Sequence, residues 1–226
     1  MKQPQQKLPH LKILQESADW LVVDKPVGLS VHNEKVNVLT LLTQIKRNPN
    51  LSFHAVHRLD AETSGVLLVA KDAEIAAKLS EDMQKDSRKL YQAVLRGEMK
   101  EDEVSWDWKL SDKAEGRKNP QGLLKDRKNC ETLVRVIEKT KYFTLAECEI
   151  LTGRQHQIRK HSALAKHAIV GDKRYNDPKY NERIASIYGA ERMFLHASEL
   201  RMRIGGRETV FTAPPPAEFK ALMRGK

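Results

Sequence analysis

The 226-residue sequence is poor in cysteine and contains only Cys130 and Cys148. Two cysteines are too few for a disulfide framework or a cysteine-rich zinc site, so we expect a reducing compartment. No apolar run approaches the ~20 residues that a bilayer-spanning helix needs. The polar N-terminus has no apolar core of signal-peptide length. These absences together predict a soluble, cytoplasmic protein.

Signatures of cofactor and metal binding are also missing. The sequence has no Gly-rich phosphate loop, no Cys-x-x-Cys pair and no carboxylate cluster of the metal-binding type. The histidine pairs His54/His57 and His156/His161 lack the i, i+4 spacing of a helical metal site. We therefore expect neither a cofactor nor a metal ion.

Positive charge exceeds negative charge. The chain has 40 Lys and Arg against 30 Asp and Glu, a formal net charge of +10. Such a surplus favours a polyanionic partner, although a generally basic soluble protein is the alternative. The length fits one large domain, and no repeat or linker divides the chain. We predict a flexible tail over residues 1–10, which are rich in Gln, Lys and Pro, and one domain over residues 11–226.

One short stretch combines several chemically useful side chains. Residues 57–65 read HRLDAETSG, and residues 66–70 read VLLVA. The second run is short, apolar and β-branched at two positions, which predicts a buried strand. Asp60 therefore lies on a tight loop held by a strand, a common place for a reactive group. The alternative is a polar turn in which Asp60 caps Thr63 or Ser64.

Periodicity and turn residues predict the other elements. We expect strands at residues 11–14, 20–23, 90–96, 132–137, 143–150, 200–204 and 208–211, and helices at residues 38–45, 72–87, 155–165 and 217–223. Gly205 and Gly206 predict a hairpin between the last two strands. Gly153 predicts a sharp entry into the helix at residues 155–165. The charged residues 109–128 contain Gly and Pro, which predicts a mobile surface loop.

Three stretches, in this order, resemble the RluA family of pseudouridine synthases. They are residues 57–71, residues 89–93 (KLYQA) and residues 151–161 (LTGRQHQIRKH), the last followed by Gly171, Asp172 and Tyr175. Residues 23–32 resemble the family too, and the similarity runs from about Leu14 to Pro215. The resemblance implies an α+β fold: one pseudouridine synthase catalytic domain with a large mixed, mostly antiparallel sheet and flanking helices. It also implies isomerisation of specific uridines in ribosomal or transfer RNA.

The resemblance assigns roles to three residues. Asp60 is implied to be the catalytic carboxylate, Arg159 its partner, and Tyr91 the residue beside the base. Pseudouridine formation breaks a glycosidic bond and remakes it to carbon 5, so a carboxylate must attack the ribose or stabilise an oxocarbenium-like ribose. Whether Asp60 attacks the ribose or assists elimination of the base stays open. A neighbouring arginine favours the ionised carboxylate. The strand pattern alone favours a half-buried aromatic in a sheet as the role of Tyr91, and only the resemblance makes it catalytic.

Four further residues are predicted to contact RNA. A uracil inside folded RNA must be flipped out, and we place Arg58 near the vacated space and Arg154 on a phosphate. Structural salt bridges are the alternatives for both arginines. Lys25 either contacts a phosphate or is simply solvated, and His57 belongs to the same predicted surface. The loop at residues 109–128 contacts RNA or is merely solvated.

The sequence departs from the family pattern in two places. The family commonly has Gly-x-Pro after the Arg159 helix, where this chain has Lys166, His167 and Ala168. The family often has Gly after the tyrosine that matches Tyr175, where this chain has Asn176. We expect these changes to affect loop geometry and substrate fit rather than the reaction.

Many relatives carry a small ribosomal-protein-like domain, which would have to precede Trp20, where there is no room for it. We therefore expect the catalytic domain to select the RNA by itself, as a monomer.

The resemblance leaves two alternatives to an RNA pseudouridine synthase. A non-catalytic RNA-binding protein is one alternative, and the intact Asp60, Tyr91 and Arg159 argue against it. A nucleoside glycosidase is the other, and the basic surface argues against that.

Overall fold

The computed structural model describes residues 10–48 and 51–225. The chain divides into two compact units, Met1–Glu81 and Asp82–Lys226, with the boundary inside helix α2 (Ala73–Lys85). The predicted flexible tail lies outside the described residues except for His10, and the single domain over residues 11–226 stays a prediction. Among the described residues, no helix combines the length and apolarity that a bilayer crossing needs.

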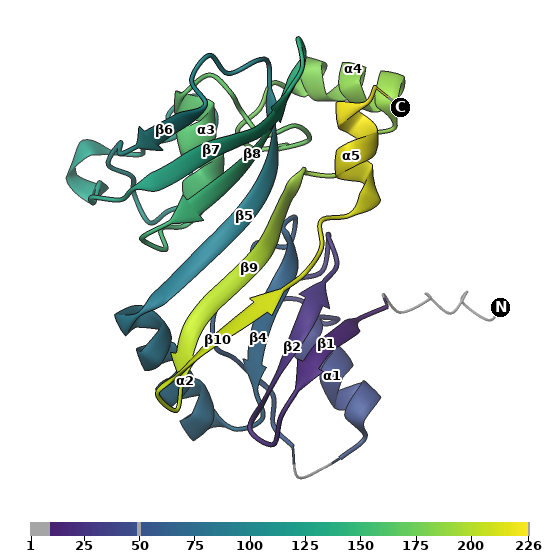
Figure 1. Ribbon diagram of the computed structural model, residues 1–226, viewed down its shortest axis with the longest axis vertical. Helices are drawn as coiled ribbons and strands as arrows, with labels where there is room; N and C mark the ends of the chain where they lie inside the picture. Colours follow the sequence, from purple (N-terminus) through teal and green to yellow (C-terminus); the bar gives the residue numbers. More distant parts are fainter. Residues whose placement is uncertain (1–9, 49–50, 226) are drawn as a thin grey trace, which may run out of the picture. The chain divides into compact units, whose positions relative to one another are not determined.

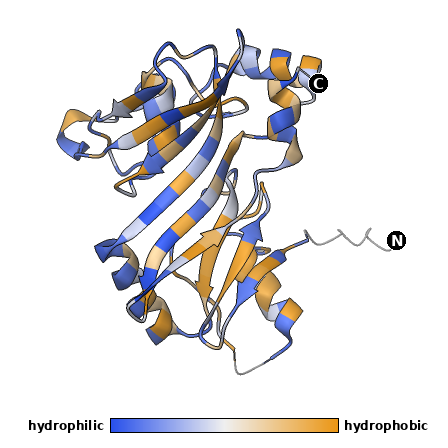
Figure 2. Ribbon diagram, viewed as in Figure 1, coloured by the Kyte–Doolittle hydropathy of each residue, from blue (hydrophilic) through white to orange (hydrophobic). Residues whose placement is uncertain are grey.

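The first unit is built on a small antiparallel sheet. Its strands are β1 (Lys12–Glu16), β2 (Trp20–Lys25), β3 (His54–Ala55) and β4 (Ser64–Ala70). Strand β2 pairs with both β1 and β4, and β3 also pairs with β4. Every residue of β4 is buried, which confirms the strand predicted after the HRLDAETSG stretch. In Figure 2, hydrophobic colour runs along most of β4 and along part of β2, whose C-terminal end is hydrophilic.

The two predicted helices of this region are present. Helix α1 (Val38–Lys46) begins with a capping box between Asn37 and Thr40, and buries Val38, Leu41 and Leu42. Ile45, in the last turn, is 49% exposed. In α2, the Asp72 carboxylate accepts hydrogen bonds from the backbone N–H groups of Glu74 and Ile75, as a helix cap does.

The second unit carries the longer strands. Their order is β10-β9-β5-β8-β7-β6, and each pairing is antiparallel. The strands are β5 (Ser87–Arg96), β6 (Glu103–Trp106), β7 (Thr132–Lys139), β8 (Phe143–Ile150), β9 (Leu195–Ile204) and β10 (Arg207–Thr212). The predicted α+β class with a mostly antiparallel sheet is confirmed, as is the hairpin at Gly205 and Gly206, both with positive φ.

Three α-helices and one short 3₁₀ helix accompany these strands in the described part of the unit. They are η1 (Leu124–Asp126), α3 (Gln157–Leu164), α4 (Pro178–Tyr188) and α5 (Ala217–Met223). Figure 1 shows α3 against strands β7 and β8, which it contacts. Helix α4 was not predicted. Its signals are local, because Asp177 caps the first turn, Pro178 occupies it and Gly189 ends the helix in a left-handed conformation.

Candidate active site

Asp60 lies at the start of a tight turn in the first unit. The backbone N–H of Thr63 donates to the Asp60 carbonyl oxygen at 3.0 Å, and β4 begins one residue later. The Ala61 carbonyl oxygen accepts from the Gly28 N–H at 2.7 Å and from the Lys25 ammonium at 3.0 Å. The half-buried Asp60 side chain therefore projects from a backbone that is fixed on both sides.

Both expectations for Lys25 are wrong. Its side chain is completely buried, and Nζ donates to the carbonyl oxygens of Pro26 (3.0 Å), Leu29 (2.8 Å) and Ala61 (3.0 Å). An ammonium group has three N–H donors, so these bonds use its full capacity. Lys25 is neither solvated nor presented to a phosphate. It ties the turn after β2 to the loop that carries Asp60.

His57 and Arg58 occupy the same loop but differ in environment. His57 Nε2 accepts a hydrogen bond from the Leu68 N–H at 3.1 Å, so this nitrogen carries no proton and the ring is held against β4. Arg58 is exposed, two residues before Asp60. His57 thus has a structural contact that the sequence did not suggest, and its contact with RNA stays a prediction, as does that of Arg58.

Tyr91 lies in the second unit, in the middle of β5. It is paired with Cys148 of β8 and Ala197 of β9, and its side chain is 8% exposed. The register between β5 and β9 shifts between Leu90 and Tyr91. Such a bulge re-aims the side chain next to it. Tyr91 is therefore an aromatic residue within the sheet, as the strand pattern predicts. Its catalytic role stays a prediction.

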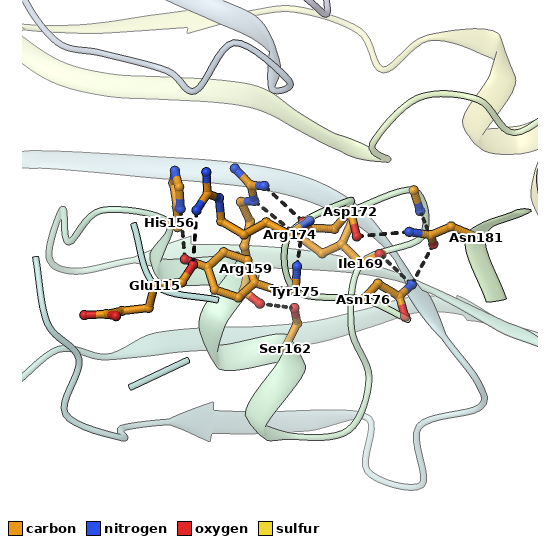
Figure 3. Close-up of polar contacts among 11 residues, drawn as sticks. Glu115, His156, Arg159, Ser162, Ile169, Asp172, Arg174, Tyr175, Asn176 and Asn181 are labelled. Atoms are coloured by element: carbon orange, nitrogen blue, oxygen red, sulfur yellow. Dashed lines mark hydrogen bonds and ion pairs between the residues drawn. The ribbon is translucent and has the colours of Figure 1, made fainter. Parts of the chain in front are cut away.

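Arg159 lies on α3 and forms a buried ion pair with Asp172. Nε donates to Oδ2 at 2.8 Å and Nη2 to Oδ1 at 3.0 Å (Figure 3). The side chains are 2% and 0% exposed, respectively. Two parallel hydrogen bonds to one carboxylate fix the plane of a guanidinium group. Asp172 is thus a site residue to which the sequence assigned no role.

Asp172 is itself held by the surrounding backbone. Its Oδ1 also accepts from the N–H groups of Arg174 (2.8 Å) and Tyr175 (3.1 Å), while Asn181 donates to its carbonyl oxygen at 3.0 Å. A Cβ atom at the preceding Gly171 would overlap the Arg192 carbonyl oxygen, so only glycine fits this turn. The carboxylate that orients Arg159 therefore has little freedom.

Tyr175 supports Arg159 from another side. The guanidinium carbon lies 5.4 Å from the centre of the Tyr175 ring, and the Tyr175 hydroxyl is 3.0 Å from His156 Nδ1 (Figure 3). His156 has a left-handed backbone (φ 57°) immediately before α3. The predicted role of Gly153 at this entry is wrong, because His156 makes the sharp turn instead.

Arg154 contacts the loop of residues 109–128. Its Nη1 lies 3.3 Å from Asp112 Oδ2, and its side chain is 30% exposed. Burial raises the pKa of the Asp112 carboxyl, but the Lys128 hydrogen bond and the Arg154 charge outweigh this and lower it. Arg154 therefore makes a salt bridge, which was one of the two roles considered for it. Because its side chain is partly exposed, the phosphate contact stays a prediction.

The structure accommodates both Lys166 and Asn176, where the sequence departs from the family pattern. Lys166 has φ 64°, a left-handed conformation that glycine adopts without strain. Asn176 is buried and donates to the Ile169 carbonyl oxygen and to Asn181 Oδ1, both at 3.0 Å. Asn176 therefore supports the same asparagine that holds the backbone of Asp172.

A buried polar chain anchors the opposite face of α3. Gln157 Nε2 donates to Thr132 Oγ1 at 3.1 Å, and that hydroxyl lies 2.9 Å from His161 Nδ1. His161 Nε2 is 2.9 Å from the Trp108 carbonyl oxygen, which can only accept, so Nε2 carries the proton. Burial lowers the pKa of His161 below its ordinary value. The helix that carries Arg159 is thus fixed by a neutral histidine.

Known proteins resemble this chain in both sequence and fold. The model of the RNA pseudouridylate synthase family matches residues 19–164. The tRNA pseudouridine synthase C of Salmonella typhimurium is 35% identical over 204 residues, which cover 81% of this chain and 76% of that protein. The Ribosomal large subunit pseudouridine synthase C of Escherichia coli K12 is 32% identical over 223 residues, covering 93% and 70%.

Two solved human structures share the architecture. RNA Pseudouridylate Synthase Domain Containing 1 superposes with a TM-score of 0.75 at 27% identity, over 95% of this chain and 86% of that one. RNA Pseudouridylate Synthase Domain Containing 4 has a TM-score of 0.79 at 22% identity, over 95% and 92%, and shows the fold. The chain therefore belongs to the RNA pseudouridylate synthase family. It is accordingly an isomerase that forms pseudouridine in RNA.

Proposed function

We propose that this enzyme isomerises specific uridines in ribosomal or transfer RNA, with Asp60 as the catalytic carboxylate. The relatives named for these two RNA classes support this substrate range. The net charge of +10 supports a polyanionic substrate. The observation that carries the proposal is the placement of Asp60 on a doubly anchored turn that leads into a fully buried strand.

The reaction needs a negative charge beside the ribose and no cofactor. Uracil leaves through cleavage of the bond between N1 and C1′, turns, and rejoins C1′ through carbon 5. Nitrogen 1 gains a proton and carbon 5 loses one, so the isomerisation balances without an external reactant. Asp60 either attacks C1′ or stabilises positive charge on the ribose as the base departs.

Arg159 is proposed to pair with Asp60 and keep it ionised. Asp172 engages Nε and one hydrogen on Nη2. Because a guanidinium group has five N–H donors in a rigid plane, it can hold a second carboxylate while Asp172 fixes its orientation. Arg159 would then set both the charge and the rotamer of Asp60.

Tyr91 and the exposed basic residues complete the proposal. Tyr91 would pack against the uracil and help to remove the proton from carbon 5. Flipping the target nucleotide leaves a gap in the RNA, and we assign the exposed Arg58 to that gap and Arg154 to a phosphate. The enzyme would act as a monomer, which size-exclusion chromatography with light scattering can check.

The test is the pseudouridine content of ribosomal and transfer RNA from a strain that lacks the gene. Complementation with the wild-type gene should restore the missing pseudouridines, whereas Asp60→Asn should not. RNA binding by purified Asp60→Asn should persist, because the substitution keeps the size of the side chain. Full restoration by Asp60→Asn would exclude Asp60 as the catalytic group. RNA with no missing pseudouridine would favour a non-catalytic RNA-binding protein.

A further inference from the structure

Two adjacent leucines in the second unit are unusually exposed. Leu123 is 57% exposed, and Leu124, at the start of η1, is 80% exposed. The value for Leu124 is the highest among the large apolar side chains that the structure describes. Single exposed apolar residues are common on protein surfaces, but a neighbouring pair on one loop forms a local apolar projection.

The loop that carries the leucines is firmly held. The buried Lys160 ammonium donates to the carbonyl oxygens of Ser111 and Lys113, both at 2.8 Å. Arg127 clasps the Gly122 carbonyl oxygen through Nε (3.0 Å) and Nη2 (2.8 Å). The carbonyl group immediately before Leu123 is therefore fixed. Our expectation of a mobile loop does not fit these contacts, which hold the leucine pair in its exposed position.

Gly122 strengthens this conclusion. It has φ +78°, and a Cβ atom there would lie 2.5 Å from Ser111 Oγ. Leu110 and Lys128 also form a bridge across the base of the loop, with hydrogen bonds in both directions at 3.0 and 2.9 Å. The exposed pair is thus the tip of a closed, packed loop.

The surroundings of the pair are strongly basic. Residues 109–128 contain seven Lys and Arg against three carboxylates. Asp112 and Asp126 pair with Lys128 and Lys113, respectively. The exposed side chains of Lys109, Lys118 and Lys125 have no ion pair with any residue that the structure describes. An apolar tip within this positive field is complementary to a polyanion that also offers apolar surface, and RNA bases and phosphates provide both.

We propose that Leu123 and Leu124 form a wedge that inserts between bases in a loop of the RNA substrate. The neighbouring lysines, Lys125 above all, would bind the flanking phosphates. Leucine side chains inserted between base steps partly unstack them and bend the nucleic acid. This inference rests on the proposed RNA substrate but assigns no catalytic step to the loop, so binding alone tests it.

The double variant Leu123→Ser/Leu124→Ser is compared with Lys125→Ala and with Ile187→Ser. Ile187 has a similar exposure of 56% but lies on α4. Affinity is measured against a synthetic RNA hairpin with 2-aminopurine in its loop, over a range of salt concentrations. We expect the double variant to bind about tenfold more weakly at every salt concentration with an unchanged salt slope, because apolar contacts release no counterions. Lys125→Ala should reduce the slope by about one.

The fluorescence of 2-aminopurine reports unstacking directly. It should rise when the wild-type protein or Ile187→Ser binds, and should rise much less with the double variant. Wild-type affinity and fluorescence in the double variant would overturn the wedge. So would a change in self-association without a change in RNA affinity, because the leucines would then contact protein. Failure of the wild-type protein to bind RNA at any salt concentration would instead contradict the proposed function itself.

Discussion

Asp172 holds Arg159 by two hydrogen bonds, of 2.8 and 3.0 Å, in a place where neither side chain reaches solvent. Burying two charges is costly unless their geometry is good and their other polar atoms are satisfied. Here the backbone N–H groups of Arg174 and Tyr175 satisfy the carboxylate further. The pair therefore orients Arg159 before any substrate arrives.

Asp172→Asn should break this orientation while keeping the turn. The amide oxygen can still accept from Arg174 and Tyr175, but the amide nitrogen would face Arg159 Nε, and both are donors. We expect a loss of about 3–5 kcal/mol in the free energy of unfolding and a roughly 100-fold lower single-turnover rate. RNA affinity should change little. Rates are measured below the melting temperature of each variant.

Ile184→Ala is the control, because it removes buried apolar volume from α4 and leaves the ion pair intact. Equal turnover in the two variants would mean that Asp172 only stabilises the fold.

Arg159→Lys and Arg154→Lys should fail in different ways. Lysine keeps the charge but loses the planar, two-pronged donor that fits a carboxylate. We expect Arg159→Lys to lower turnover strongly with little change in the dissociation constant for RNA. Arg154→Lys should mainly weaken binding, and only modestly, since a phosphate accepts a point charge. Single-turnover rates and dissociation constants measured separately decide this, and the reverse pattern would mean that the two roles are exchanged.

Lys25→Met should destabilise the protein without weakening its electrostatic attraction to RNA. Loss of the ammonium group leaves the carbonyl oxygens of Pro26 and Leu29 without this donor, which costs about 1–3 kcal/mol per unsatisfied buried group. The salt slope of RNA binding should match the wild type. Arg58→Met, at an exposed position, is the matched control and should reduce that slope. A reduced slope in Lys25→Met would show that its ammonium reaches a phosphate after all.

His161 should make the stability depend on pH. Burial lowers its pKa in the folded state, while the unfolded chain has a value of about 6.5. The unfolded state therefore takes up the proton first, and the contribution of His161 to stability is lost as the pH falls below about 6.5. The melting temperature of wild type minus that of His161→Gln should shrink across this range. His32→Gln, at an exposed position, is the control variant.

Much of this structure followed from local patterns. The apolar run before Lys71 predicted β4, and the paired glycines at positions 205 and 206 predicted the final hairpin, because both depend on near neighbours in the chain. Motif order identified the family and the Asp60 loop. Helix α4 was missed although Asp177, Pro178 and Gly189 mark its ends, since its interior is polar except for a few side chains.

The sequence was least informative where distant residues meet. The sequence predicted that Lys25 binds a phosphate or is solvated, because nothing nearby in the chain reveals its hydrogen bond to the Ala61 carbonyl oxygen. The ion pair between Arg159 and Asp172 joins α3 to the turn that carries Asp172. That turn is held in place by Asn181 and by backbone hydrogen bonds. Buried charge pairs of this kind leave no periodic pattern, so only the folded structure reveals them.

The turn at Gly171 has a consequence for attempts to redesign the enzyme. Because a single additional carbon atom would collide with the carbonyl group of Arg192, saturation mutagenesis at this position should return glycine alone. The exposed position of Lys166 should accept several residues. Libraries intended to alter which uridine is chosen therefore have a fixed point here, and diversity is better placed in the loops on either side of it.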